Sequence, residues 1–396
     1  MRRCPRVPTS RSCSCIFATS RTPRLRRLFS TRNPERVEVR CGSAGSVTID
    51  LFNVAKHPSS SPFFIHLPPF PSPDGFPAPL PEFLQEKPVA SINYRWISPV
   101  AAASGDRGSN VARWPMPIHD TLFAYSWLVK NFQREAPRRR DIYVYGSHLG
   151  GSLATSLSLT ETFPHMRFAV RGVISYNGVY NWTMFLPDHP VNQLPKGMKN
   201  PAPRSALLEG THLHHLQEML PQFFKSPADL FDPFVSPALF FHNPGLLVPS
   251  SYSISEEEAA ALEAIIDPDY IIERPKVPRK SHLVYPARAS TGKIPECLFL
   301  YDSPTVVSVG KWGTRKLATG QGNTMESQAL ELVELMRRSV DKVELKERRQ
   351  WDDDVSSDEP DRRVQAMEVG DEREALELNE GSEKVIKKWL VDRIGE

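Results

Sequence analysis

Residues Asp141–Ala154 read DIYVYGSHLGGSLA, in which a mostly apolar strand passes through a tight turn directly into a helix. The turn has the form Gly-x-X-x-Gly, from Gly146 to Gly150, with His148 at its centre. The flanking glycines allow strand and helix to approach closely, and such an elbow exposes the side chain at its apex. The sequence therefore predicts a strand over 141–145, a helix over 149–163, and an exposed His148 between them.

Strands and helices alternate on both sides of this turn. Apolar side chains recur at helical spacing at Leu122, Tyr125 and Leu128, which predicts a helix over 119–132. Near-continuous apolar runs such as VRGVISY, at 170–176, are typical of strands buried on both faces. Further strands are predicted at 37–41 and 47–51 (a hairpin), 62–67, 89–94, 296–301 and 343–346, and further helices at 325–339 and 383–394. This order indicates a mostly parallel sheet with helices on both faces.

The alternation is lost between about residues 177 and 291. Short helical patterns at 206–224 and 256–266 are separated by proline-rich stretches, and no strand pattern holds. We expect this segment to form a cap, with its aromatic run 239–241 over an apolar cleft at the carboxyl edge of the sheet. The glycine-rich residues 310–322 and the acidic residues 352–361 are predicted to be loops.

Two more segments carry a family resemblance together with the elbow. They are PIHD at 117–120, followed by YSWL at 125–128, and FDPFVSP at 231–237. In this order they resemble α/β-hydrolases of the hormone-sensitive-lipase (fold-3) branch, over about residues 36–396 with a long insertion near 245–290. The chain looks most similar to fungal α/β-hydrolase-like proteins whose elbow lacks serine. The resemblance implies an α/β-hydrolase fold, as a single domain over 35–396 with a cap at about 177–291, and a site of the ester or lipid hydrolase type.

The residues expected to carry that chemistry are largely missing. In Gly-x-Ser-x-Gly elbows the nucleophile is the central residue, whereas here the centre is His148, flanked by Ser147 and Leu149. Ser147 stands one position too early and is expected to point away from the apex. The family order also requires a histidine after the last strand, yet the last histidine is His282. The sequence therefore lacks both the nucleophile and the base of a serine triad.

The oxyanion loop is altered as well, and one acid remains. Where related esterases have His-Gly-Gly-Gly, this chain reads HLPPF from His66 to Phe70, and proline offers no N–H group. Asp302 lies where the family has its acid, although Ser303 separates it from the proline that would follow directly. Loss of the nucleophile or of the histidine alone costs on the order of 10⁶ in turnover.

We therefore predict a degenerate, non-catalytic site in a protein that binds a small apolar ligand or a protein partner, without a cofactor. The alternative is a divergent carboxylic-ester or lipid hydrolase with an unorthodox site, in which His148 itself acts as nucleophile or base. His212, His214 and His215 have the spacing of metal ligands on a helix, but no carboxylate or cysteine pattern completes a site. We expect them to form a polar helix face and predict no metal site.

The first 34 residues differ in composition from the rest. They hold nine arginines, nine serines or threonines and no acidic residue. Since the whole chain has a net charge of +3, the residues after 34 carry a net charge of −6. This composition is typical of a mitochondrial transit peptide and predicts import into the matrix, with cleavage near Phe29. The alternative is a disordered basic tail on a cytoplasmic protein. The acidic remainder does not indicate nucleic-acid binding, no apolar run is long enough for a membrane span, and the sequence does not indicate an oligomeric state.

Overall fold

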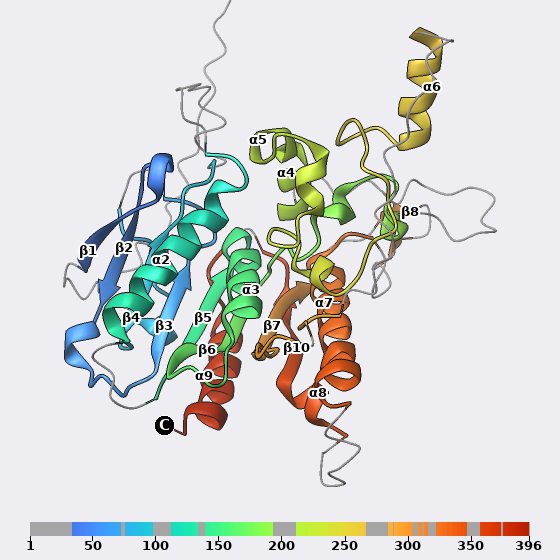
Figure 1. Cartoon of the computed structure of the whole chain (residues 1–396). Coiled ribbons are helices and arrows are strands. Elements are labelled where there is room, and N and C mark those ends of the chain that lie inside the picture. Colours follow the sequence, from blue (N-terminus) through green and yellow to red (C-terminus); the bar gives the residue numbers. More distant parts are fainter. Residues whose placement is uncertain are drawn as a thin grey trace, which may run out of the picture. The chain divides into compact units, whose positions relative to one another are not determined.

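Eight strands form the central sheet of the protein. The computed structural model describes residues 34–72, 76–97, 112–133, 139–192, 211–266, 284–287, 289–303, 308–310, 313–315, 322–346, 357–373 and 375–395. The strand order is β1-β2-β4-β3-β5-β6-β7-β10 (Figure 1). Strand β2 is antiparallel to β1 and β4, and the other adjacent pairs are parallel. The bounds are β1 Glu35–Arg40, β2 Ser46–Phe52, β3 Phe63–Leu67, β4 Val89–Asn93, β5 Arg140–Ser147, β6 Phe168–Tyr176, β7 Glu296–Ser303 and β10 Val364–Asp371.

Helices cover both faces of this sheet. One face packs against α2 (Met116–Phe132), α3 (Leu149–Glu161) and α7 (Met325–Ser339), and the other against α9 (Glu380–Ile394), as Figure 1 shows. The elbow joins β5 directly to α3. A mostly parallel sheet with this strand order, helices on both faces and an elbow at its centre has the α/β-hydrolase fold, which confirms the predicted fold class.

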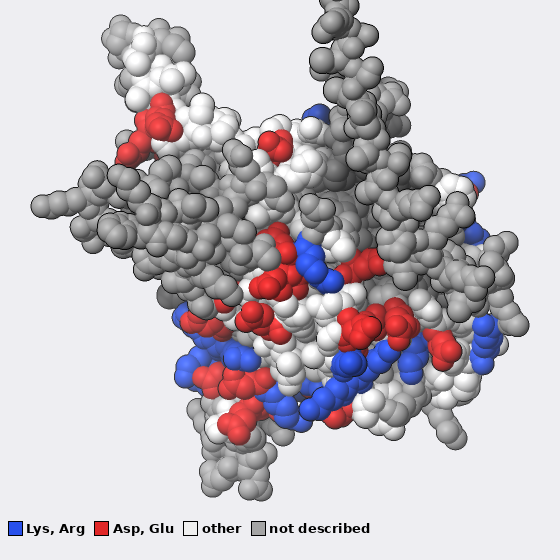
Figure 2. Space-filling model, turned by 180° about the vertical axis from the view of Figure 1, so that it is seen from behind, with Lys and Arg blue, Asp and Glu red and all other residues white. Residues whose placement is uncertain are grey.

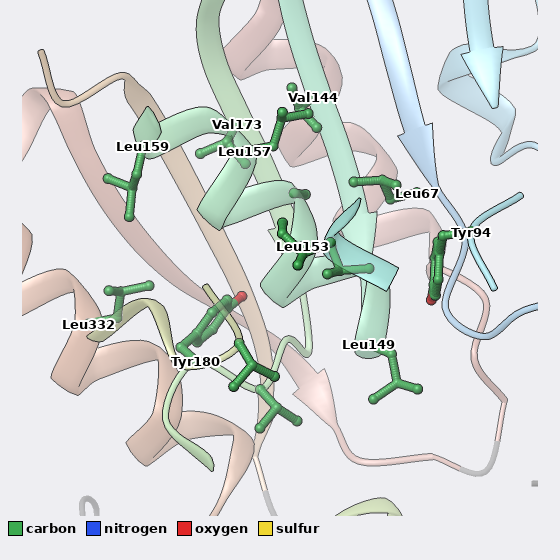
Figure 3. Close-up of a cluster of buried hydrophobic side chains, with 14 of the residues drawn as sticks. Leu67, Tyr94, Val144, Leu149, Leu153, Leu157, Leu159, Val173, Tyr180 and Leu332 are labelled. Carbon is green, nitrogen blue, oxygen red and sulfur yellow. The ribbon is translucent and has the colours of Figure 1, made fainter. Parts of the chain in front are cut away.

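Leucines at four-residue spacing bury one side of α3 in the core. Leu149, Leu153 and Leu157 are fully buried and belong to the same core cluster as Val144 of β5 and Val173 of β6 (Figure 3). Residues four apart lie on the same side of a helix, so these side chains line one buried side of α3. Each buried leucine stabilises the fold by about 1.5–3 kcal/mol. This packing fixes the position of the helix that begins at the elbow.

A buried ion pair connects the end of β4 to α2. The Asp120 carboxylate is fully buried, and it accepts hydrogen bonds from Nη2 of Arg95 at 2.6 Å, from its Nε at 2.9 Å and from its backbone N–H at 2.8 Å. Three charge-assisted donors compensate the desolvation of the carboxylate. The pair thereby fixes the chain segment that follows β4.

The cap, residues 177–291, is built of short helices. The segment 206–224, predicted as one helix, contains two, α4 (His212–Glu218) and α5 (Leu220–Phe223), because Met219 interrupts it, and residues 206–210 lie outside the described part. The predicted helix at 256–266 is α6 (Glu256–Ile266). Cap rings pack on Trp96, which follows β4: its ring centroid lies 6.2 Å from Trp182 and 6.0 Å from Phe224. The described residues of the cap contain no strand.

The predictions for the carboxyl-terminal third need corrections. The last strand is β10, at 364–371, whereas the predicted strand at 343–346 is wrong, since 340–344 is a π-helical continuation of α7. A short helix, α8 (Glu359–Arg363), begins inside the segment predicted as an acidic loop. The segment 310–322 was predicted to be a loop, but it contains the short strand β9 (Gly313–Arg315), which pairs with β8 (Ser308–Gly310). Apart from β9, the structure describes only residues 310 and 322 of this segment.

The face covered by α9 carries mixed charge. Basic and acidic side chains lie in adjacent bands over the described part of this side (Figure 2). Two basic side chains of α9 form ion pairs, Lys387 with Glu82 at 2.7 Å and Arg393 with Glu296 at 3.1 Å. Among the described helices, none is long and apolar enough to cross a membrane. Residues 1–33, and with them nearly all of the predicted transit peptide, lie outside the described residues, while Pro34–Glu396 forms one compact unit.

Candidate functional site

The elbow between β5 and α3 keeps the strained backbone of a nucleophile elbow. His148 has φ 50° and ψ −117°, a region that side chains other than glycine rarely adopt. A Cβ atom at Gly146 would lie 2.3 Å from the carbonyl oxygen of Gly150, and one at Gly150 would lie 2.4 Å from that of Leu67. The two glycines are therefore required for the close approach of α3 to β5 and β3, as the sequence predicts.

The apex side chain is buried, which contradicts the expectation that the turn exposes it. Only 1% of His148 is exposed, and its ring centroid lies 6.1 Å from Phe70, 5.8 Å from Tyr176 and 5.3 Å from His212. Within the described part of the chain, neither ring nitrogen has a hydrogen-bond partner. Burial, with a smaller contribution from His212, lowers the pKa of His148 to about 3. The imidazole is therefore neutral at physiological pH.

The backbone donor that an oxyanion would need is already engaged. The N–H group of Leu149, the residue after the apex, donates to the carbonyl oxygen of Pro69 at 3.2 Å. The preceding carbonyl, of Pro68, accepts from the Tyr94 hydroxyl at 2.9 Å. In serine hydrolases of this fold the oxyanion hole combines the N–H of the residue after the nucleophile with one from the β3 loop. Here the N–H group of Leu149 is already hydrogen-bonded to Pro69, and the loop after β3 begins with Pro68 and Pro69, which have no N–H group.

His66 and Ser147 do not join the site. His66 lies within β3, and its Nδ1 is 3.0 Å from the Ser91 hydroxyl, while its ring stacks on Tyr145 at 5.7 Å. Burial lowers the pKa of His66 to about 3. His66 thus lies in β3, which ends at Leu67 directly before the loop that begins with Pro68, and its side chain is held inside the sheet. Ser147 is buried and hydrogen-bonds Tyr145, away from the apex.

Asp302 is held by a tyrosine and an asparagine instead of an imidazole. It lies at the end of β7, where its Oδ2 accepts from the Tyr176 hydroxyl at 2.6 Å and from Nδ2 of Asn177 at 3.0 Å. The backbone N–H of Asp302 donates to Oδ1 of Asn177 at 2.9 Å. Burial and this carboxylate raise the pKa of Tyr176. Asp302, predicted to correspond to the acid, thus anchors Tyr176 and Asn177.

A histidine does reach the elbow, from the cap. The loop after β10, where the family has its histidine, contains Glu372 and Arg373, and α4 binds to this loop. The backbone N–H of His212 donates to Oε1 of Glu372 at 3.2 Å, and its ring Nε2 lies 2.9 Å from the carbonyl oxygen of Arg373. These contacts place the His212 ring against His148. Burial raises the pKa of the Glu372 carboxyl, and the nearby Asp302 charge adds to this effect.

This role of His212 was not predicted. A polar helix face was expected for the three histidines of α4, and His215 does lie exposed, 3.7 Å from Glu218. His212 is half-buried instead, and its partners are some 160 residues away along the chain, so no local pattern indicates them. Among the described residues, no group of three or more His, Cys, Asp and Glu side chains is arranged to hold a metal ion.

The aromatic run 239–241 does not cover the elbow. Phe240 and Phe241 pack on Tyr285, with ring centroids 4.9 and 5.3 Å away, and the helical turn that contains Phe240 contacts α3 and α7. Two cavities lined by described residues also lie elsewhere, one beside Phe168 and one beside Leu390. In the described ring contacts this run packs on Tyr285 and does not reach His148, so its predicted position over the elbow is wrong.

Comparisons with known proteins return esterase structures at low similarity. The hyperthermophilic esterase from the archaeon Pyrobaculum calidifontis is 11% identical, with a TM-score of 0.45 and coverage of 90% of this chain and 82% of that one. Carboxyl esterase 2 from the mycorrhizal fungus Tuber melanosporum is 14% identical, with a TM-score of 0.45 and coverage of 91% and 86%. A hormone-sensitive lipase from a metagenome library is 14% identical, with a TM-score of 0.37 and coverage of 78% and 73%. No protein-family model and no curated protein matches the chain. The assignment of an α/β-hydrolase fold therefore rests on the strand order and the elbow of this chain.

Proposed function

We propose that this protein is a non-catalytic protein of the α/β-hydrolase fold that acts by binding. One observation carries the proposal: a buried, neutral imidazole fills the apex of the elbow while the adjacent Leu149 N–H is bonded to Pro69. A serine hydrolase needs a hydroxyl at the apex and a free donor beside it, since the first attacks and the second stabilises the resulting oxyanion. In this chain an imidazole stands at the apex in place of the hydroxyl, and the N–H group beside it is already hydrogen-bonded.

The closed elbow favours a protein partner over a small apolar ligand at this position. His212 and Phe70 both pack on the His148 ring, so a ligand that entered here would have to displace at least one of them. A partner that binds the outer surface of the cap needs no such displacement. The cap is well suited to present such a surface, since its short helices are fixed to the sheet by the aromatic cluster around Trp182.

A second candidate function is a divergent ester or lipid hydrolase, and the contact between His212 and His148 favours it. A neutral imidazole is itself a nucleophile, and a second imidazole 5.3 Å away offers a base. The geometry supports it less well, because Nε2 of His212 already lies 2.9 Å from the carbonyl oxygen of Arg373. The Leu149 donor would also have to leave Pro69 before it could bind an oxyanion.

Esterase assays on matched proteins separate the two candidates. The full chain, His148→Ala and His212→Ala should be incubated with p-nitrophenyl esters of several acyl lengths. We expect all three to hydrolyse them at the same background rate. Turnover by the unmodified protein that both variants abolish would support the divergent hydrolase and contradict the binding proposal. Native mass spectrometry of the purified chain then tests for a retained apolar ligand, which we do not expect at the elbow.

A further inference from the structure

A cavity of about 310 Å³ lies at the edge of the sheet opposite to the elbow. Helix α3 begins at the elbow and runs for 13 residues, so Glu161 at its end lies about 20 Å from His148. The first residues of β6 and the second half of α2 complete the cavity. It is lined chiefly by Tyr125, Val129, Glu161, Phe163, Met166 and Phe168. This cavity is therefore separate from the elbow and from the function proposed for it.

Glu161 places an uncompensated carboxylate in this mostly apolar wall. Its side chain is half-buried, and burial raises its pKa, with no charged neighbour among the causes. In the described part of the chain, no basic side chain forms an ion pair or a hydrogen bond with it. Partial burial of a carboxylate costs free energy, which a bound cation would offset.

Aromatic rings stand around the same space. Tyr125 is buried and Phe163 half-buried, and both line the cavity together with Phe168. The guanidinium of Arg140 lies 5.9 Å from the centroid of Phe168, so that ring already interacts with one cation. The Phe163 ring contacts the ring of His165, with centroids 6.0 Å apart, and His165 also lines the cavity. A cation in this space would be attracted to the face of the Tyr125 or Phe163 ring.

Hydrogen bonds fix the turn from Phe163 to Met166, which lines one side of the cavity. Arg171 donates to the carbonyl oxygens of Phe163 at 2.9 Å and of Met166 at 2.5 Å, and its Nε donates to Asp141 at 3.0 Å. The backbone N–H of Met166 also donates to the Phe163 carbonyl, at 3.0 Å. Because this turn is fixed before any ligand arrives, binding does not have to order it.

We propose that this cavity is a binding site for a small organic cation, an ammonium group on an aromatic or branched apolar body. The ammonium would lie beside Glu161 and over the rings of Tyr125 and Phe163, and the apolar body would contact Val129 and Phe168. The volume lies at the lower end of the range for ligand sites, about 300–1,000 Å³, which limits the ligand to roughly a single substituted ring.

Calorimetric titration of the full chain with benzyltrimethylammonium tests the site, with benzyl alcohol as the uncharged probe. We expect saturable binding of the cation with a Kd in the low millimolar range and at least tenfold weaker binding of the alcohol. Glu161→Gln, which keeps the shape and removes the charge, should weaken cation binding at least tenfold. Phe163→Leu should weaken it severalfold. The matched control Glu257→Gln removes an exposed charge on α6 and should leave binding unchanged.

Three results would overturn the proposal: no saturable binding of the cation, equal binding of the alcohol, or undiminished binding by Glu161→Gln. Thermal unfolding of each variant shows whether it is folded. If Glu161→Gln does not fold, the comparison of cation with alcohol on the unmodified chain, together with Phe163→Leu, still decides the question.

Discussion

Substitution of His148 by serine returns a hydroxyl to the apex of the elbow, and we predict that it does not create an esterase. The serine would have no paired imidazole, because Asp302 binds Tyr176 and Asn177 and the loop after β10 supplies Glu372. Loss of the histidine of a triad costs on the order of 10⁶ in turnover even when the serine is present.

The engaged backbone N–H group of Leu149 is a second reason to expect no turnover. The Leu149 N–H must break its 3.2 Å bond to Pro69 before it can bind an oxyanion, and one such donor is worth about 10²–10³ in turnover. His212 does not replace the base, because its ring lies 5.3 Å from the centroid of the His148 ring, and a serine hydroxyl would sit closer to the backbone than that ring. Turnover of His148→Ser should therefore remain at the uncatalysed background.

The assay combines burst kinetics on p-nitrophenyl acetate with covalent labelling by a fluorophosphonate probe. His148→Ala is the matched control, since it opens nearly the same space without a hydroxyl. A variant with both His148→Ser and Glu372→His adds an imidazole to the loop after β10 and should be labelled more than His148→Ser alone. Labelling of His148→Ser that exceeds His148→Ala would refute the reasoning, since it would mean that the elbow already activates a serine.

Three further predictions follow from the fold, the buried histidines and the composition of the amino-terminal segment. Arg95→Ala should destabilise the protein by about 3–5 kcal/mol in chemical denaturation, because it leaves the Asp120 carboxylate buried without its charged partner, and an unchanged midpoint would contradict this. His148 and His66 each have a pKa near 3 when folded and 6.5 when exposed, so the unfolded chain binds more protons between these values. Their contribution to the free energy of unfolding is therefore complete above pH 6.5 and is lost as the pH falls toward 3, by roughly 5 kcal/mol for each histidine, and His148→Ala should flatten that profile. Finally, residues 1–34 fused to a fluorescent protein should direct it to mitochondria, and a uniformly cytosolic signal would argue against a transit peptide.

The elements with strong local patterns could be predicted from the sequence, and the elements with mixed patterns could not. The glycines of the elbow and the apolar run of β6 indicate their structures directly, since buried strands and close turns tolerate few residue types. Strand β10 was missed because it pairs with β7 at the edge of the sheet and keeps several side chains partly or fully exposed, which weakens its apolar pattern. A strand that is covered on one side only requires fewer apolar residues.

The candidate site was predicted only in part, for a different physical reason. The replacement of serine by His148 and the prolines after His66 are visible in the sequence, and they indicate which groups are missing. The groups that fill the site come from elsewhere in the chain: His212 arrives from the cap and Glu372 from the loop after β10. Such contacts depend on how the cap folds back on the sheet, and no spacing within α4 encodes them.

The strained elbow is retained with a histidine at its apex, and packing explains why. Holding His148 at φ 50° costs on the order of 1–3 kcal/mol, which other interactions of the fold must offset. The turn, however, sets the start of α3, and the three buried leucines of that helix together stabilise the fold by more than this strain. A relaxed turn would shift the register of α3 against β5 and separate Gly146 from Gly150. The elbow thus contributes to packing whichever side chain stands at its apex, and the buried imidazole of His148 is compatible with the fold.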